Sequence, residues 1–226
     1  MSLTSGSGPL SARRAGRFTA PVPDGVAYVE PFRRRVRGVH AGQVVVDTER
    51  ALLVHRPGHA PIWAFPERDV HGAPTVPVRE AAGHVEVPWD AVDAWYQEDD
   101  PVFLHAPNPY HRVECVHTSR HVRVEVAGVA LVDTTGVLVV YEAALEPRAY
   151  VAREVVRMDL LVPNARKTYC PYKGEASYWD AVVGDVVVED AAWSYEHPAP
   201  EAVAVRGLLS FDDARVAVAH DIPPAG

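Results

Sequence analysis

The sequence has little lysine, asparagine, isoleucine or cysteine, with two residues of each among 226. The two cysteines, Cys115 and Cys170, are too few and too far apart for a disulfide framework, so we expect reduced thiols and a cytoplasmic protein. Long apolar runs are also missing, and none approaches the roughly 18 residues that a membrane helix needs. We therefore expect no membrane partner.

An excess of basic residues is missing as well. The formal net charge is −8, whereas a protein that binds duplex nucleic acid usually carries a basic stripe. The one basic run, at residues 33–37, would divide its arginines between the two faces of a strand, which fits a solvated edge strand. We therefore expect no nucleic-acid partner.

An internal repeat divides the chain. Residues 35–54 align without gaps on residues 121–140, and nine of the twenty positions are identical. The repeat is too long for a solenoid unit, so we predict two tandem copies of one small domain, over residues 28–118 and 119–222. Residues 1–27 are rich in Ser, Gly, Pro and Arg, and we predict a disordered lead-in there.

Both copies have the pattern of antiparallel β structure. In each copy a strand with alternating apolar residues ends at Ala-Gly, a hairpin returns through a valine-rich strand, and a third strand comes next. We expect positive φ at Gly42 and Gly128, where the turns are tight, and another hairpin around Gly184. Residues 88–96 predict a short helix. The predicted fold class is mostly β, with two small antiparallel domains and a short helix.

The scarce residues gather in one short segment. Both lysines, one cysteine and one asparagine lie within residues 164–174, which end in Cys-Pro-Tyr-Lys-Gly. A nearby cation lowers the pKa of a thiol and makes it nucleophilic, and a turn at the proline and glycine would bring Lys173 towards Cys170. A buried inert cysteine beside a surface lysine is the alternative. Cys170 and Lys173 are therefore candidates for catalysis or ligand binding.

Aromatic residues are concentrated in and after this segment. Aromatic walls with a few polar groups are typical of small-molecule pockets. The alternative is that Trp179 and Trp193 belong to the core, since each lies beside a predicted strand. We predict ligand contacts from Tyr172, Trp193 and Tyr195, with Arg157 as a second cation.

Signals for a metal or a cofactor are weak. On a strand, His111, Cys115 and His117 would point to one side. Structural zinc sites, however, usually show closely paired cysteines and histidines, so we predict no metal. The sequence contains no familiar glycine-rich phosphate loop and no Gly-x-Ser-x-Gly elbow. We expect no cofactor.

Several motifs succeed one another along the chain, at residues 105–113, 119–123, 157–161, 168–174, 176–179 and 192–201. Together with the tandem layout, they resemble the bacterial family called domain of unknown function 427. The resemblance implies a compact β structure similar to the β-tent group. The family sometimes carries a nucleotidyltransferase label, which these motifs do not support. The first copy departs from the pattern after Val70, because it has no Cys-Pro-Tyr-Lys-Gly.

These observations predict a protein that binds a small polar or anionic ligand, in a crevice of the second domain or between the domains. The expected ligand-binding residues are Cys170, Tyr172, Lys173, Trp193, Tyr195 and Arg157. Two alternatives stay open. One is an enzyme that uses Cys170 as nucleophile or redox centre. The other is a protein-interaction module with an exposed aromatic surface.

Overall fold

The computed structural model describes residues 3–4, 8–14, 16–23, 25–142 and 145–223. The chain forms two compact units, Met1–His111 and Arg112–Gly226. Their regular elements are antiparallel strands and short 3-10 turns, which confirms the predicted class. Some of the predicted disordered lead-in, residues 1–27, lies outside the described residues. In the described part of that segment, no strand occurs.

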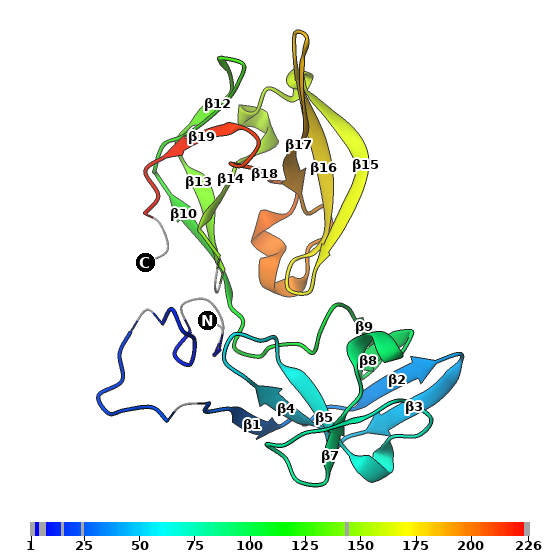
Figure 1. Ribbon diagram of the computed structural model, residues 1–226. Coiled ribbons are helices and arrows are strands. Elements are labelled where there is room, and N and C mark those ends of the chain that lie inside the picture. Colours follow the sequence, from blue (N-terminus) through cyan, green and yellow to red (C-terminus); the bar gives the residue numbers. More distant parts are fainter. Residues whose placement is uncertain (1–2, 5–7, 15, 24, 143–144, 224–226) are drawn as a thin grey trace. The chain divides into compact units, whose positions relative to one another are not determined.

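The described residues of the first unit form two antiparallel sheets, in the orders β1-β4-β5-β7-β6 and β3-β2-β8-β9. Its strands are β1 (Tyr28–Pro31), β2 (Val36–His40), β3 (Gln43–Thr48), β4 (Leu52–His55), β5 (Ile62–Pro66), β6 (Val76–Pro77), β7 (His84–Glu86), β8 (Ala94–Gln97) and β9 (Asp100–Val102) (Figure 1). Its 3-10 turns are η1 (Glu67–Asp69) and η2 (Trp89–Ala91). The main core cluster of this unit is rich in aromatic residues, with Phe32, Trp63, Phe65 and Trp95 buried together.

In the second unit, the part of the chain that the structure describes forms three antiparallel sheets, in the orders β10-β13-β14, β12-β11-β19 and β15-β16-β17-β18. Its strands are β10 (Val113–Thr118), β11 (Val122–Val126), β12 (Val129–Thr134), β13 (Val137–Glu142), β14 (Arg148–Tyr150), β15 (Leu161–Cys170), β16 (Gly174–Val183), β17 (Val186–Ser194), β18 (Leu209–Phe211) and β19 (Ala217–His220). Its 3-10 turns are η3 (Arg153–Val155), η4 (Met158–Leu160) and η5 (Pro200–Val205).

The sequence repeat is also a structural repeat, and it extends beyond the aligned segment. In the first unit β1 pairs with β4, and in the second unit β10 pairs with β13 in the same register. The isolated bridge between Val46 and Val70 has its counterpart between Val132 and Val156. Turn η1 before Val70 corresponds to turn η3 before Val156. Each copy therefore builds the same scaffold from the same sequence positions.

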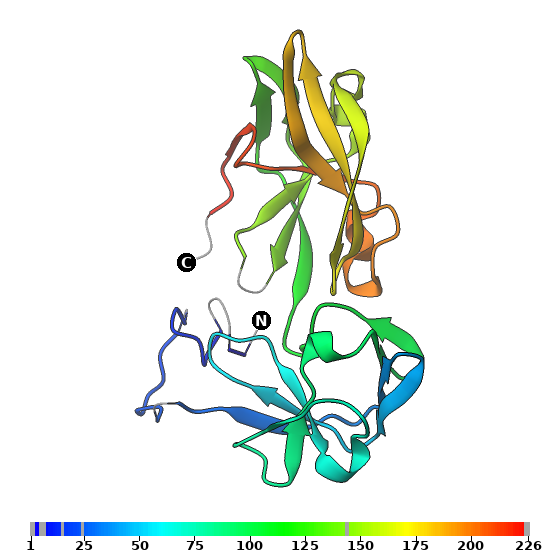
Figure 2. The same cartoon turned by 45° about the vertical axis from the view of Figure 1, so that its right-hand side comes forward.

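The two units differ in the chain that comes after this shared scaffold. In the first unit Phe65 pairs with Val85, and in the second unit Val151 pairs with Leu209. In the first unit, only the short segment between Val70 and Val85 separates the shared bridge from this pairing. In the second unit the corresponding segment is much longer and contains the long strands β15, β16 and β17, which lie side by side in both views (Figures 1 and 2). The Cys-Pro-Tyr-Lys-Gly motif therefore belongs to an insertion in one copy.

The predicted hairpins are confirmed. Ala41 and Gly42 have φ of 48° and 75°, and Ala127 and Gly128 have φ of 49° and 77°. Positive φ at both residues of a two-residue loop is the pattern of a type I′ turn, which matches the twist of the flanking strands. Gly184, between β16 and β17, also has positive φ.

The short helix predicted over residues 88–96 is confined to the 3-10 turn η2, and its later residues form strand β8. Strand β8 pairs with β2, where Trp95 lies opposite Gly38. A Cβ on Gly38 would come 2.9 Å from the Trp95 ring, so the glycine lets the indole lie against the strand. Sheet pairing and indole burial therefore outweigh a helical pattern too short to be stable alone.

No helix in the described part of the chain is both long enough and apolar enough to cross a membrane.

Candidate functional site

The motif lies at the tip of the inserted hairpin. Cys170 ends β15 and Gly174 begins β16, so the three residues between them form the turn. The Lys173 N–H donates to the Cys170 carbonyl at 3.3 Å, and the Ala199 N–H donates to the Lys173 carbonyl at 3.0 Å. Gly174 has φ of 92°, and a Cβ there would come 3.2 Å from the His197 carbonyl oxygen. Glycine is therefore required both by the backbone and by the segment against the tip.

The Lys173 side chain points to a buried carboxylate. Its ammonium donates to Oε2 of Glu142, the last residue of β13. The two side chains are only 10% and 7% exposed. Removing two charges from water costs several kcal/mol per ion, which mutual attraction offsets only when the pair is well formed. The inserted hairpin and the repeated scaffold are therefore joined by a charge pair.

Both thiols of the protein pack against one apolar cluster, which we call the Tyr150 cluster. Its buried members are Leu138, Val140, Tyr150, Ala176, Tyr195, Ala202 and Val205. Cys115 comes from β10 and Cys170 from β15, and both are half-buried free cysteines. Burial raises the pKa of the Cys115 thiol, while the positive charge of Lys173 acts in the opposite direction. The Lys173 ammonium is therefore close enough to Cys115, on β10, for its charge to influence that thiol.

Tyrosine and tryptophan complete this region. The Trp193 Nε1–H donates to the Tyr150 hydroxyl at 3.1 Å. Burial raises the pKa of Tyr150 and of Tyr195, so both hydroxyls stay protonated at neutral pH and can act as neutral hydrogen-bonding groups. The site accordingly offers an ammonium, a carboxylate, thiols and phenols beside aliphatic side chains.

The structure brings together most of the residues that the sequence singled out. Cys170, Trp193 and Tyr195 belong to the Tyr150 cluster or pack against it, and Tyr172 is half-buried in the hairpin turn next to Lys173. Of the two tryptophans considered for the core, Trp179 is buried in the main core of the unit.

Arg157 lies elsewhere. It precedes β15, whereas Cys170 ends that strand, and its guanidinium pairs with Asp159 at 2.8 and 2.6 Å. A strand rises about 3.3 Å per residue, so the ten residues of β15 separate the two ends by about 30 Å. The structure therefore does not bring Arg157 to the other predicted residues.

Sequence reasoning missed Glu142, Tyr150 and Cys115 as parts of this region. Glu142 ends β13 and Tyr150 ends β14, so both come from the repeated scaffold rather than from the motif. The sequence pattern suggests a site role for Cys115 only as a metal ligand. The register of the repeat could have indicated them, because it places β10, β13 and β14 in one sheet. Residues of this sheet pack against residues of the insertion.

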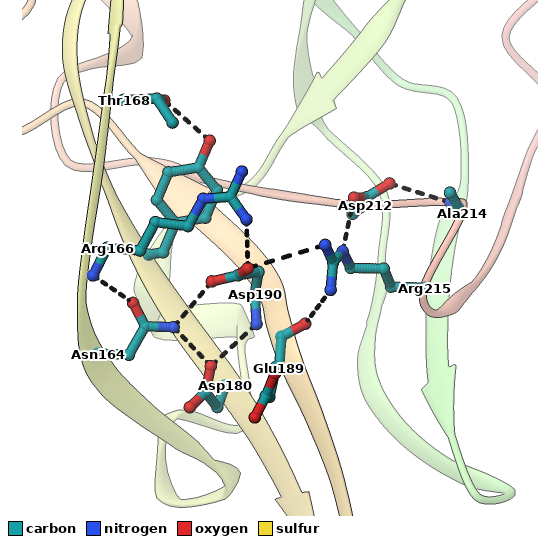
Figure 3. A network of polar contacts seen from close by, with 10 residues as sticks. Asn164, Arg166, Thr168, Asp180, Glu189, Asp190, Asp212, Ala214 and Arg215 are labelled. Carbon is teal, nitrogen blue, oxygen red and sulfur yellow. Dashed lines mark hydrogen bonds and ion pairs between the residues drawn. The ribbon is translucent and has the colours of Figure 1, made fainter.

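A second polar cluster lies farther along the inserted hairpin, and Figure 3 shows its members converging on Asp190. The Asn164 amide donates to Asp180 at 2.5 Å and to Asp190 at 3.0 Å. Arg166 pairs with Asp190, and Arg215 lies 3.7 Å from the same carboxylate. Burial disfavours the charged form of Asp190, but the hydrogen bonds from Arg166 and Asn164 outweigh it and lower the pKa.

This second cluster explains a local irregularity of the sheet. The register of β16 and β17 shifts next to Asp180, and Asp190 on the opposite strand has φ of 53°. The Asp190 N–H, displaced from the regular ladder, donates to the Asp180 carboxylate at 2.9 Å. The acidic groups are thus paired with donors inside the fold, and the cluster stabilises a bulge.

Within the described ranges, no three His, Cys, Asp or Glu side chains gather in a way that could hold a metal ion.

Comparison with known families gives one result. Residues 28–97 and 114–222 match the sequence model of a family described as Domain of unknown function (DUF427). The matched segments cover most of the chain and include both copies of the repeat. No curated protein matches the sequence.

Proposed function

The chain belongs to the DUF427 family, and from that premise we propose that its second unit binds a small polar or anionic ligand beside the Lys173–Glu142 pair. The observation that carries the proposal is the buried ion pair itself. Replacing such a pair with apolar residues is often neutral or stabilising, so a buried pair is weak evidence for stability. Convergent polar groups beside apolar walls are typical of ligand sites.

The chemistry around the pair supports a ligand with oxygen atoms. An ammonium has three donors, and Glu142 accepts one from Lys173. An anionic or polar oxygen of a ligand would share the others. Because Glu142 already neutralises much of the charge, a ligand with both acceptors and donors fits better than a simple anion. Cys170, Tyr172, Trp193 and Tyr195 would supply the surrounding contacts.

The proposal includes a cytoplasmic location. Both cysteines are free thiols, and reduced thiols are the rule in that compartment.

A thermal-shift screen of nucleotides, sugars and carboxylates tests the proposal. The informative variant is the double substitution Lys173→Met with Glu142→Gln, since it removes the charges without leaving one unpaired. Lys167→Ala is the matched control, because Lys167 is the only other lysine and is exposed. A ligand at a hundred times its Kd stabilises the folded state by about 2.7 kcal/mol.

The expected result is a ligand that stabilises the wild type and Lys167→Ala but not the double variant. The proposal is wrong if every stabilising ligand acts equally on all three proteins.

A second candidate function is catalysis or redox chemistry at Cys170. The observation in its favour is that the two thiols of the protein pack against the same cluster. Alkylation by iodoacetamide as a function of pH tests it, with the Cys115→Ser variant so that only Cys170 reports. A reactive nucleophile would label well below the pH range of an ordinary thiol, near 8.5. Labelling at the ordinary pH, or none in the folded state, removes this candidate.

A further inference from the structure

The first unit contains a cavity of about 100 Å³ beside its tryptophan cluster. Trp63, Trp89 and Trp95 line it together with Phe65 and Ile62. Benzene occupies an engineered apolar cavity of about 150 Å³, so this space suits a ring of five or six atoms. Neither the sequence motifs nor the family description assigns a role to it.

The three indole rings form one continuous wall. The ring centroids lie 5.8 Å apart for Trp63 and Trp89, 5.5 Å for Trp63 and Trp95, and 5.6 Å for Trp89 and Trp95. At these distances the rings contact one another rather than surround a central space. A flat ligand can stack on such a wall, whereas a bulky spherical cation has no enclosing cage.

One buried polar group of these tryptophans has no partner. Trp63 is only 4% exposed, and its Nε1 has no hydrogen-bond acceptor among the residues that the structure describes. By contrast, the Trp95 Nε1–H donates to the Trp89 carbonyl at 3.2 Å. Buried indole N–H groups usually find a partner, because leaving a buried donor unpaired is costly. A ligand acceptor would satisfy Trp63.

Glu86 supplies the complementary group. It lies on the wall of the same cavity, and its side chain is 28% exposed. Burial raises the pKa of Glu86, while the charge of Arg56, 3.9 Å away, acts against that shift. A carboxylate in such a position accepts a hydrogen bond from a ligand N–H or O–H.

The segment at the edge of the cavity is strained. Leu104 has φ of 72°, and the residue is 60% exposed. A bulky residue rarely adopts this left-handed conformation, and strain of this kind clusters at active sites and ligand clamps. The next two residues, His105 and Ala106, line the cavity. The surrounding fold therefore holds this segment of the wall in place, although Leu104 has a backbone conformation that a leucine rarely adopts.

We propose that this cavity binds a small planar ring compound that carries a hydrogen-bond acceptor beside a donor. The ring lies against the tryptophans, the acceptor pairs with Trp63 Nε1–H, and the donor pairs with Glu86. This site involves only first-unit residues and stands independently of the Lys173 proposal.

NMR of the indole N–H groups tests this inference on the full chain, with 2-pyrrolidinone as the probe. The five tryptophans give five indole signals, and the one lost in Trp63→Phe belongs to Trp63. That signal is expected to move saturably as the lactam is added. N-Methyl-2-pyrrolidinone, which has no donor, is expected to bind about tenfold more weakly, as is the lactam to Glu86→Gln.

Two variants control the experiment. Ala60 is exposed and lines the cavity, so Ala60→Phe fills the space at little risk to folding and is expected to abolish the shift. Trp193→Phe, in the second unit, is expected to leave the titration unchanged. If Trp63→Phe does not fold, the Ala60→Phe titration decides.

Three results would overturn the inference. The first is an absence of any saturable indole shift with the lactam in the wild type. The second is a shift that persists unchanged in Ala60→Phe. The third is equal or tighter binding of benzene or of tetramethylammonium, which would show that the acceptor and donor do not matter.

Discussion

Lys173 and Glu142 form an ion pair that connects the insertion of the second unit to its repeated scaffold. Lys173 lies at the tip of the β15–β16 hairpin, and Glu142 ends β13. The described part of the first unit has no such hairpin, and its sequence has no lysine. The pair is therefore specific to one copy, and it lies where the scaffold and the insertion meet beside the Tyr150 cluster.

Removing one member of this pair should destabilise the protein more than removing both. Lys173→Met takes the ammonium away from the buried Glu142 carboxylate, and we expect a loss of about 3 kcal/mol. Adding Glu142→Gln should recover most of that loss. Urea unfolding followed by the NMR signals of β15 and β16 measures both effects. Single variants within about 0.5 kcal/mol of the wild type would show that the pair is not buried as described.

Alkylation of Cys115 should report the charge of Lys173. Burial raises the pKa of this thiol and the ammonium opposes that effect. The pH midpoint of iodoacetamide labelling in Cys170→Ser should thus lie above the free-thiol value near 8.5. Adding Lys173→Met removes the opposing charge and should move the midpoint still higher. A midpoint at the free-thiol value, or one that moves down, contradicts this arrangement.

The bulge at Asp190 should depend on Asn164. Asn164→Ala removes donors to two partly buried carboxylates, and hydrogen bonds to charged groups are worth about 1.5 to 3 kcal/mol. We expect a loss of about 2 kcal/mol in urea unfolding. Lys167→Ala, on the same strand but exposed, should change stability by less than about 0.5 kcal/mol. Equal effects of the two substitutions would count against the network.

Acid should weaken the first unit through Glu80. The hydrogen bond from the Arg56 guanidinium outweighs burial and lowers the pKa of Glu80 from 4.5 to about 2. A depressed carboxyl pKa stabilises the fold fully above the unfolded-state value, and that stability is lost as the pH falls from about 4.5 towards 2. The difference in unfolding free energy between wild type and Glu80→Gln should shrink over that window. A constant difference across it would contradict the assignment.

The scaffold could be predicted from the sequence because its signals are local. Alternating valines and the Ala-Gly turns specify hairpins through neighbouring residues, and the type I′ geometry at Gly42 and Gly128 is as expected. The helix expected around Trp95 was largely replaced by a strand because Gly38, on a different strand, accommodates the indole. A short segment cannot reveal a partner that is distant in sequence.

The candidate site could be predicted only in part, for the same reason. The cluster of scarce residues falls on the inserted hairpin, but its members serve different structures. Lys173 pairs with Glu142, whereas Asn164 holds the bulge at Asp190. Arg157 was predicted to join the site as a second cation, yet an extended strand carries it away from Cys170.

The proposed function requires the ammonium of Lys173 to have a role in ligand binding beyond its pairing with Glu142. The double substitution Lys173→Glu with Glu142→Lys tests this role, because it keeps an ion pair while moving the ammonium to β13. Affinity of the swapped protein for the ligand found in the screen is measured by calorimetry, after urea unfolding has shown its stability. We predict near wild-type stability with binding weakened at least about tenfold. Unchanged affinity in a stable swapped protein would contradict the proposed role of Lys173.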